Sequence, residues 1–149
     1  NKIFIKNDKL LLFATANSDS CNTNNSANAV FIKTDKMRLK IALGNLLSNA
    51  IKYSQNGEPT YDIDITAAAD EDKVVISVQD YGIGIAKEEL SRIFNMFYRS
   101  EGNTNTKSTG LGLYLVKDAL SKIEGQVDVS SEVGKGTCFT LHIPNLKED

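Results

Sequence analysis

Apolar and polar residues alternate along several stretches of the chain, which is the pattern of β-strands with one buried face. The clearest pair, TYDIDITAAAD and KVVISVQD, is separated by a short acidic stretch and predicts a hairpin. A second pair near the end predicts another hairpin around the turn VGKGT. Short runs rich in β-branched and aromatic residues predict further strands before residue 35. The predicted strands are residues 2–5, 9–16, 28–34, 60–70, 73–80, 126–132 and 137–144.

Three other stretches repeat apolar residues every three or four positions, which is the pattern of amphipathic helices. They are residues 36–54, 87–100 and 111–125. Asp35 can cap the first helix, Gly125 takes the usual place of a glycine after the third, and Ile93, Phe94 and Phe97 share a face of the second. These elements predict an α+β domain, a two-layer sandwich whose mixed, mostly antiparallel sheet carries helices on one face.

The first predicted helix has two distinct faces when it is projected at about 100° per residue. Its core face consists of Leu39, Leu43, Leu46, Leu47 and Ala50. The opposite face gathers Asn45, Asn49 and Lys52, with Tyr53 beside them. Asparagine is a poor helix former, so this face is either an ordinary solvent-exposed polar surface or a surface on which the amides have a function. The second alternative is a nucleotide site, because an amide oxygen suits Mg²⁺, a lysine suits a phosphate and a tyrosine can stack on a base.

Two glycine segments are candidates for backbone contacts with a ligand. In DYGIGI, Asp80 ends a strand before two glycines, which is either an ordinary turn or a carboxylate that accepts from the amine of adenine. In STGLGLYLV, Gly110 and Gly112 stand where a polar loop enters a helix, and N–H groups at such an entry favour phosphates. The second segment is not a dinucleotide-binding fingerprint, because no strand precedes it and the third glycine is missing.

Composition narrows the classes of function. The 149 residues are 41% hydrophobic, which suits one compact domain, and the net charge of −2 argues against nucleic acid or an anionic membrane as partner. Cys21 and Cys138 match no metal spacing and fit a reduced cytoplasmic protein. No apolar run approaches the roughly 18 residues of a membrane span. His142 lies on an apolar strand and is interpreted as structural, and because the sequence begins with Asn1 we expect a piece of a longer protein.

The order of these segments resembles one protein family. NLLSNAIKYS, DYGIGI, IFNMFYRS, a polar loop, TGLGLYLVKDAL and a final G-x-G-T follow one another as in the ATP-binding catalytic domain of sensor histidine kinases. That domain belongs to a wider group with gyrase, Hsp90 and MutL, so the resemblance implies a Bergerat-type ATP-binding fold. It runs from about residue 31 to 144, while residues 1–29, with their polar loop, match only loosely. Residues 1–149 are then a single domain that ends in a solvent tail at 145–149.

For the phosphate end of the ligand, the resemblance implies four catalytic residues. Asn49 matches the Mg²⁺ ligand, and Asn45 supports the same triphosphate region from one turn back. Lys52 matches a lysine that contacts phosphate, and Arg99 resembles an arginine that reaches the phosphates. Residues 98–109 would be the ATP lid.

For the adenine end, the resemblance implies that Asp80 selects the base, that Thr137 helps to hold Asp80 and the base through water, and that Tyr53 lies beside the ring. Phe94 and Phe97 resemble residues that pack at the base of the lid. The remaining residues expected at the nucleotide are Gly82, Gly84, Ile85, Gly110, Leu111 and Gly112.

The implied activity is transfer of the γ-phosphate of ATP to a protein histidine in two-component phosphorelay signalling. Where the gyrase branch has a glutamate that activates water, this chain has Asn45, which cannot act as a general base. In this family the accepting histidine lies on a separate helical dimerisation domain, so we expect half of an enzyme that does not phosphorylate itself in isolation. The expected partners are that domain of the same parent protein and a downstream response regulator.

The resemblance also implies a cytoplasmic domain, monomeric when isolated, whose parent protein can be anchored in a membrane without this domain touching it. Two alternatives to the histidine kinase stay open. One is a non-catalytic, nucleotide-gated interaction module, and the other is a protein serine kinase of the same fold.

Overall fold

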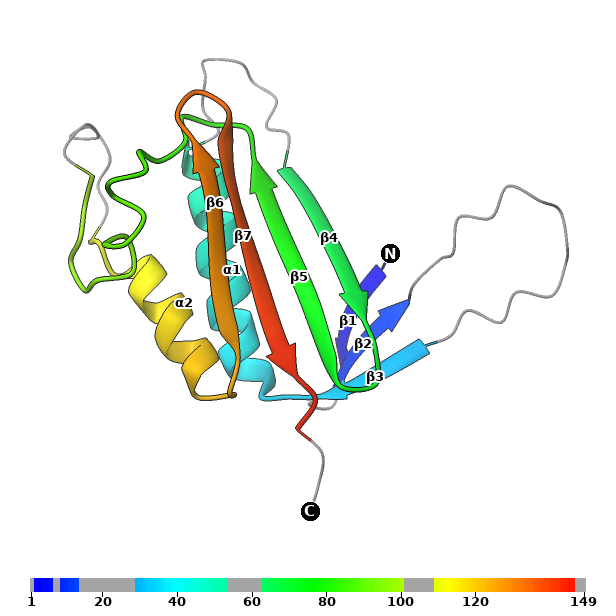
Figure 1. Ribbon diagram of the computed structural model, residues 1–149. Coiled ribbons are helices and arrows are strands. Elements are labelled where there is room, and N and C mark those ends of the chain that lie inside the picture. Colours follow the sequence, from blue (N-terminus) through cyan, green and yellow to red (C-terminus); the bar gives the residue numbers. More distant parts are fainter. Residues whose placement is uncertain (1, 7–8, 14–28, 54–62, 101–108, 147–149) are drawn as a thin grey trace, which may run out of the picture.

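The computed structural model describes residues 2–6, 9–13, 29–53, 63–100 and 109–146. Within them the chain forms two antiparallel sheets and two α-helices (Figure 1). The elements are β1 (Lys2–Lys6), β2 (Lys9–Phe13), β3 (Ala29–Lys33), α1 (Lys36–Tyr53), β4 (Ile63–Ala69), β5 (Lys73–Asp80), α2 (Gly112–Ser121), β6 (Gln126–Glu132) and β7 (Gly136–Pro144). The predicted α+β class is confirmed, with β1, β2 and β3 in a sheet of their own instead of in the main sheet.

The larger sheet has the strand order β4-β5-β7-β6, and its neighbouring strands are all antiparallel. The two predicted hairpins form it: β4 with β5, and β6 with β7. The hairpins join through β5 and β7, whose register pairs Asp80 with Thr137. This pairing brings together, at one end of the central strands, two residues that are distant in the sequence.

Both helices cover the same face of this sheet (Figure 1). Alternate residues of β5 and β7 point toward them, as the period-two pattern requires. The buried apolar residues of the central strands are Val74, Ile76, Val78, Phe139, Leu141 and Ile143, and those of the helices are Leu39, Ala42, Leu46, Ala50, Val116, Ala119 and Leu120. No helix in the described part of the chain is both long and apolar enough to cross a membrane.

α1 begins where the cap was predicted. The Asp35 side chain accepts hydrogen bonds from the N–H groups of Met37 (2.9 Å) and Arg38 (3.1 Å). Its buried stripe differs from the projected one, because Ala42 is buried while Leu43 and Leu47 are only partly buried. α1 packs on α2 as well as on β5, so the buried face of α1 is the face that lies between these two elements. The predicted stop at residues 54–59 lies outside the described residues.

The predicted helix at residues 87–100 is wrong. The segment is a succession of turns, in which the N–H groups of Leu90, Arg92 and Asn95 donate to the carbonyl three residues back. Among the described backbone hydrogen bonds of this segment, that of the Ile93 N–H reaches four residues back, to the carbonyl of Glu89. Its apolar residues Leu90, Ile93 and Phe94 pack on the core without a regular helix, because tertiary contacts, such as the hydrogen bond from the Phe97 N–H to the Gly110 carbonyl, override the local pattern.

α2 is shorter than predicted and ends at Ser121. The left-handed residue that follows it is Glu124, with φ 56°, and not Gly125. Gly125 is required for space instead, since a Cβ there would lie 2.9 Å from the carbonyl oxygen of His142. His142 itself pairs with Asp128 on the neighbouring strand (2.9 Å).

The prediction of a solvent tail from residue 145 is wrong for its first two residues. The Asn145 side chain accepts from the N–H of Lys33 (2.9 Å) and donates to the carbonyl of Glu71 (3.0 Å). The N–H of Leu146 donates to the carbonyl of Lys33 (3.0 Å). These bonds tie the end of β7 to the end of β3 and to the β4–β5 turn, while residues 147–149 lie outside the described part.

Candidate functional site

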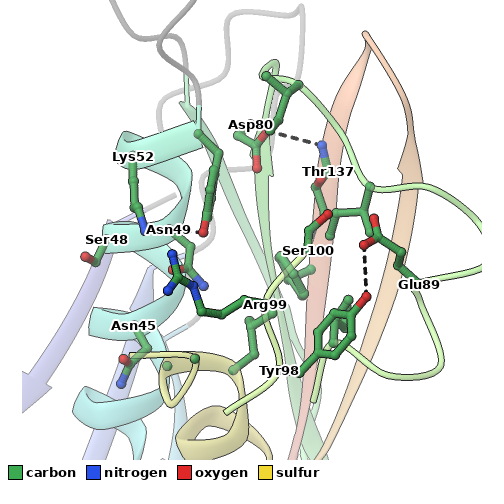
Figure 2. Close-up of a pocket in the computed structure, with 18 of the residues that line it drawn as sticks. Asn45, Ser48, Asn49, Lys52, Asp80, Glu89, Tyr98, Arg99, Ser100 and Thr137 are labelled. Carbon is green, nitrogen blue, oxygen red and sulfur yellow. Dashed lines mark hydrogen bonds between the residues drawn. The ribbon is translucent and has the colours of Figure 1, made fainter. Parts of the chain in front are cut away.

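A cavity of about 360 Å³ opens between α1, the paired ends of β5 and β7, the segment 81–100 and the start of α2 (Figure 2). This volume lies in the usual range for small-molecule sites. The lining combines amides, cations, carboxylates and hydroxyls with a few apolar side chains. The lining residues are Asn45, Ser48, Asn49, Lys52, Tyr53, Asp80, Ile83, Gly84, Ile85, Glu89, Ile93, Tyr98, Arg99, Ser100, Thr109, Gly110, Gly112, Leu113, Thr137 and Phe139.

The α1 wall presents amides to the cavity. Asn45 donates its Nδ2 to the carbonyl of Ile41 (2.8 Å), which holds the amide in place and leaves its Oδ1 on the other side. Asn49 follows one turn later and is also half-buried. Gly112 faces both side chains, since a Cβ there would lie 3.2 Å from Asn45 Oδ1 and 3.9 Å from Asn49 Nδ2. A side chain at position 112 would therefore crowd the two amides.

The end of α1 adds a cation and an aromatic ring. Lys52 Nζ donates to Tyr53 Oη at 3.3 Å and lies 4.8 Å from the centre of the Tyr53 ring. The N–H of Ile83 donates to the carbonyl of Tyr53 (3.3 Å), which fastens the glycine segment to the end of the helix. Both side chains are half-buried and line the cavity.

Asp80 is the buried carboxylate of the opposite wall, at 5% exposure. Its Oδ1 accepts from the N–H of Gly82 (3.0 Å) and from the N–H of Thr137 (3.2 Å; Figure 2). Burial raises the pKa of Asp80 above its ordinary value, and the two backbone hydrogen bonds partly oppose this effect. A group that donates from the cavity would stabilise the ionised form, so the carboxylate is suited to bind such a ligand.

The backbone at this wall is tightly packed because of two glycines with positive φ. Gly84 (φ 69°) lies so close to the β6–β7 hairpin that a Cβ would overlap the carbonyl oxygen of Glu132. Gly136 (φ 112°) stands in the same way against the carbonyl oxygen of Asp80. Both conformations are strained for residues with side chains.

The segment that carries Arg99 is fixed by its neighbours. Tyr98 Oη donates to the Glu89 carboxylate (2.9 Å; Figure 2), and the Arg92 guanidinium lies 5.0 Å from the centre of the Tyr98 ring. Hydrogen bonds from the side chains of Ser100 and Tyr98 lower the pKa of Glu89. In Figure 2 the Arg99 side chain extends toward α1, where the two asparagines lie.

The two ends of the predicted lid meet. The N–H of Phe97, whose φ is 62°, donates to the carbonyl of Gly110 (3.0 Å). Gly110 has φ 70°, and a Cβ there would lie 2.7 Å from the carbonyl oxygen of Tyr98. Of the predicted lid at 98–109, residues 101–108 lie outside the described residues.

Most of the predicted site residues line this one cavity: Asn45, Asn49, Lys52, Tyr53, Asp80, Gly84, Ile85, Arg99, Gly110, Gly112 and Thr137. Gly82 is buried behind the wall, and Leu111 caps α2 without lining the cavity. Phe97 is 66% exposed and does not line it either. The prediction that Phe97 shares a packed face with Ile93 and Phe94 is wrong for Phe97, because the segment is not a helix.

Ser48 and Glu89 line the cavity but were not predicted, and Tyr98 and Ser100 were predicted only as part of the lid at 98–109. Ser48 lies within about 60° of Asn45 in the helical projection, so the same projection could have identified it. Glu89, Tyr98 and Ser100 carried no such individual signal, because their contacts depend on how the turns at 87–100 fold.

The α1 wall fits Mg²⁺, which takes oxygen ligands and commonly keeps water and substrate phosphates around one or two protein groups. The amides of Asn45 and Asn49 face Gly112, which has no side chain to crowd them, and each amide can offer an oxygen. Among the described residues no cluster of three or more His, Cys, Asp or Glu exists that could hold a metal alone. A cation here would therefore depend on the ligand for most of its coordination.

Known proteins similar to this chain form one family. The family model "Histidine kinase-, DNA gyrase B-, and HSP90-like ATPase" matches residues 34–147. Sensor histidine kinase YxdK of Bacillus subtilis (strain 168) is 40% identical over 107 residues, 71% of this chain and 32% of that protein. The aerobic respiration control sensor protein ArcB of Escherichia coli (strain K12) is 39% identical over 122 residues, 78% of this chain and 15% of that protein. The chain thus spans a third or less of these relatives.

Solved structures give the same result for the fold. Mycobacterial sensor histidine kinase MprB aligns with a TM-score of 0.68 and 26% identity, over 78% of both chains. Full-length ShkA in complex with AMPPNP aligns with a TM-score of 0.63 and 32% identity, over 76% of this chain and 22% of that chain. The chain therefore belongs to the histidine kinase-, DNA gyrase B- and HSP90-like ATPase family, and is a domain of the sensor histidine kinase type.

Proposed function

We propose that this chain binds Mg·ATP in the cavity and transfers the γ-phosphate to a histidine on a separate dimerisation domain of its parent protein. The observation that supports this proposal most strongly is that the two walls of the cavity differ in their polar groups. Amides and cations gather along α1 and at Arg99, whereas acceptor oxygens of Asp80 and Thr137 form the wall at the sheet edge. A nucleoside triphosphate has the matching division, with anionic phosphates at one end and a base at the other. The AMPPNP complex of ShkA, a structural neighbour, supports an ATP-like ligand.

The cationic and amide residues would act on the phosphates. Asn49, with Asn45 beside it, would hold Mg²⁺, which when bound neutralises phosphate charge and orients the γ-phosphate. Lys52 and Arg99 would bring two further positive charges to the phosphates. The start of α2 at Gly112 would offer free backbone N–H groups to an anion, because the first turn of a helix leaves them without helical partners.

Three features of the cavity lining favour transfer to a protein over hydrolysis. Asn45 has no basic group. The other carboxylate that lines the cavity, Glu89, accepts a hydrogen bond from Tyr98, and its pKa is lowered, so it is a weak base. Among the described lining residues, Asp80 is the remaining carboxylate, and it lies on the wall assigned to the base, away from the cations that would hold the phosphates. A nucleophile supplied by another domain fits this arrangement better than an activated water.

The proposal also names partners and a location. The accepting histidine belongs to the dimerisation domain, and the phosphate then passes to a response regulator, as expected for a two-component system. ATP and the regulator are available in the cytoplasm, so we place the domain there. We propose a monomer for the isolated domain, because the dimer contacts of this family lie mostly in the dimerisation domain.

Calorimetric titration with ATP in the presence of Mg²⁺ or EDTA tests the proposed site. We expect binding that weakens in EDTA. Asn49→Ala should weaken binding in Mg²⁺ by about tenfold or more, the value of one hydrogen bond or ligand to a charged group. Asn95→Ala is the matched control, because Asn95 is exposed and does not line the cavity. Equal weakening in both variants, or unfolding of Asn49→Ala, would show that Asn49 has a structural role.

A further inference from the structure

Ser131, on β6, stands behind Thr137 and does not line the cavity. Its Oγ has three polar neighbours at hydrogen-bond distance. It donates to the carbonyl of Gly136 (2.9 Å), accepts from the N–H of Ile85 (2.8 Å) and lies 2.8 Å from Thr137 Oγ1. A serine hydroxyl can make three hydrogen bonds, so these three neighbours fill its bonding capacity.

The direction of the bond between the two hydroxyls follows from counting protons. A serine hydroxyl has one proton and two acceptor positions. The carbonyl of Gly136 can only accept, and two oxygens 2.9 Å apart without a proton between them would repel, so the Ser131 proton lies on that bond. The Ile85 N–H fills one acceptor position of Ser131. The hydroxyl of Thr137 must therefore donate its proton to Ser131 and fill the second.

This assignment decides what Thr137 offers to the cavity. With its proton given to Ser131, Thr137 Oγ1 has only lone pairs left, and its N–H is bonded to Asp80 (Figure 2). An ionised Asp80 is also an acceptor only. The wall formed by these two residues then contains acceptors side by side, and a ligand group or an ordered water that meets them has to donate.

We propose that Ser131 is a specificity-determining, positioning residue of the nucleotide site: it fixes the Thr137 hydroxyl as an acceptor and so selects a base with an amino group over one with a carbonyl oxygen. Adenine carries the amino group, and hypoxanthine carries a carbonyl oxygen at the same position. The inference rests on the proposed ATP site, and it assigns the selection to a residue that need not touch the base.

The test compares affinities for ATP and ITP in the full chain by calorimetry with Mg²⁺. The two bases differ at this position and in a proton that hypoxanthine carries on the adjacent ring nitrogen, and this second difference is the same in every variant compared. Wild type should prefer ATP. In Ser131→Ala the Thr137 hydroxyl is free to turn and donate to the carbonyl oxygen, so the preference should fall by about tenfold, the value of one hydrogen bond. Ser131→Thr keeps a hydroxyl and should restore the preference. A purely structural role would weaken both nucleotides equally and leave their ratio unchanged, which would overturn the inference.

Thr137→Val keeps the test valid if Ser131→Ala does not fold. Valine has nearly the shape of threonine and leaves Ser131 in place, so it should also reduce the preference for ATP over ITP. In the Thr137→Val background, adding Ser131→Ala should not change the ratio further, since the two residues act through one hydroxyl. If wild type prefers ATP and the ratio of ATP to ITP affinity is unchanged in Thr137→Val, the inference about Ser131 is wrong while the proposed ATP site stands. If wild type binds neither nucleotide, both the inference and the proposed ATP site are wrong.

Discussion

Gly112→Ala should affect ligand binding at the candidate site with little effect on the fold, because the added methyl group contacts the two asparagines and little else. The new Cβ would lie 3.2 Å from Asn45 Oδ1, a distance at which a neighbour must move by a few tenths of an ångström. Asn45 cannot retreat without losing its bond to the carbonyl of Ile41. Crowding of this kind costs about 1–3 kcal/mol, and we expect it to fall on the ligand-bound state, in which the amides have to face the phosphates and the cation.

The expected result is ATP affinity lower by about 10- to 100-fold, since each 1.4 kcal/mol is tenfold. The free energy of unfolding should change by less than about 1 kcal/mol, because alanine is a better helix former than glycine and offsets part of the crowding. Calorimetric titration with Mg·ATP measures the affinity, and urea unfolding without nucleotide measures the stability.

Gly44→Ala is the matched control on the neighbouring helix. Gly44 is exposed in α1, directly before Asn45, and no atom lies within 4 Å of a Cβ added there. The variant should gain about 1 kcal/mol of stability from helix propensity and bind ATP like wild type. If Gly112→Ala binds ATP as tightly as Gly44→Ala does, the amides of α1 are not at the phosphate site and the reasoning is refuted.

Three further variants test single contacts. Asp80→Asn keeps the oxygen that accepts both backbone N–H groups, but it should weaken ATP binding by about tenfold or more. Since burial raises the pKa of Asp80, the contribution of this carboxyl group to stability is present at acid pH and is lost as pH rises through the folded pKa. Urea unfolding across pH should show that this loss is absent in the variant. Tyr98→Phe removes the hydrogen bond to Glu89 and should lower the free energy of unfolding by at most about 1 kcal/mol near pH 7. Because the pKa of Glu89 is lowered, this loss should shrink as pH falls and the carboxylate protonates. A loss of stability that does not change with pH would contradict a hydrogen bond from Tyr98 to the ionised Glu89. Asn145→Ala loses two side-chain hydrogen bonds, so urea unfolding should show about 1–2 kcal/mol less stability while calorimetry shows unchanged ATP affinity.

Elements whose signals are local could be predicted from the sequence. The cap at Asp35 depends on residues within three positions, and the strands of both hairpins depend on alternation within each strand. The polar face of α1 is also a local property, since helical geometry alone places Asn45 and Asn49 one turn apart. These predictions were confirmed for the described residues.

Features that depend on contacts between distant segments could not be predicted. The apolar spacing at 87–100 fits a helix, but Tyr98 bonds back to Glu89 and the Phe97 backbone approaches Gly110, so tertiary contacts override the local pattern. The bond of Ser131 to Thr137 depends on a hairpin register, and the hydrogen bonds of Asn145 depend on β3 and the β4–β5 turn. None of these partners is marked by the residues next to it in the sequence.

Transfer of labelled phosphate to a protein histidine distinguishes the proposed kinase from its two alternatives. The chain would be mixed with Mg²⁺, γ-labelled ATP and the histidine-bearing dimerisation domain of its parent protein, and the label would be tested for stability in acid. We expect label on the dimerisation domain that is lost in acid, as phosphohistidine is, and no transfer by Asn49→Ala. Acid-stable label would instead indicate a serine kinase, and absence of any label would indicate a nucleotide-gated interaction module. Either result would rule out the proposed histidine kinase.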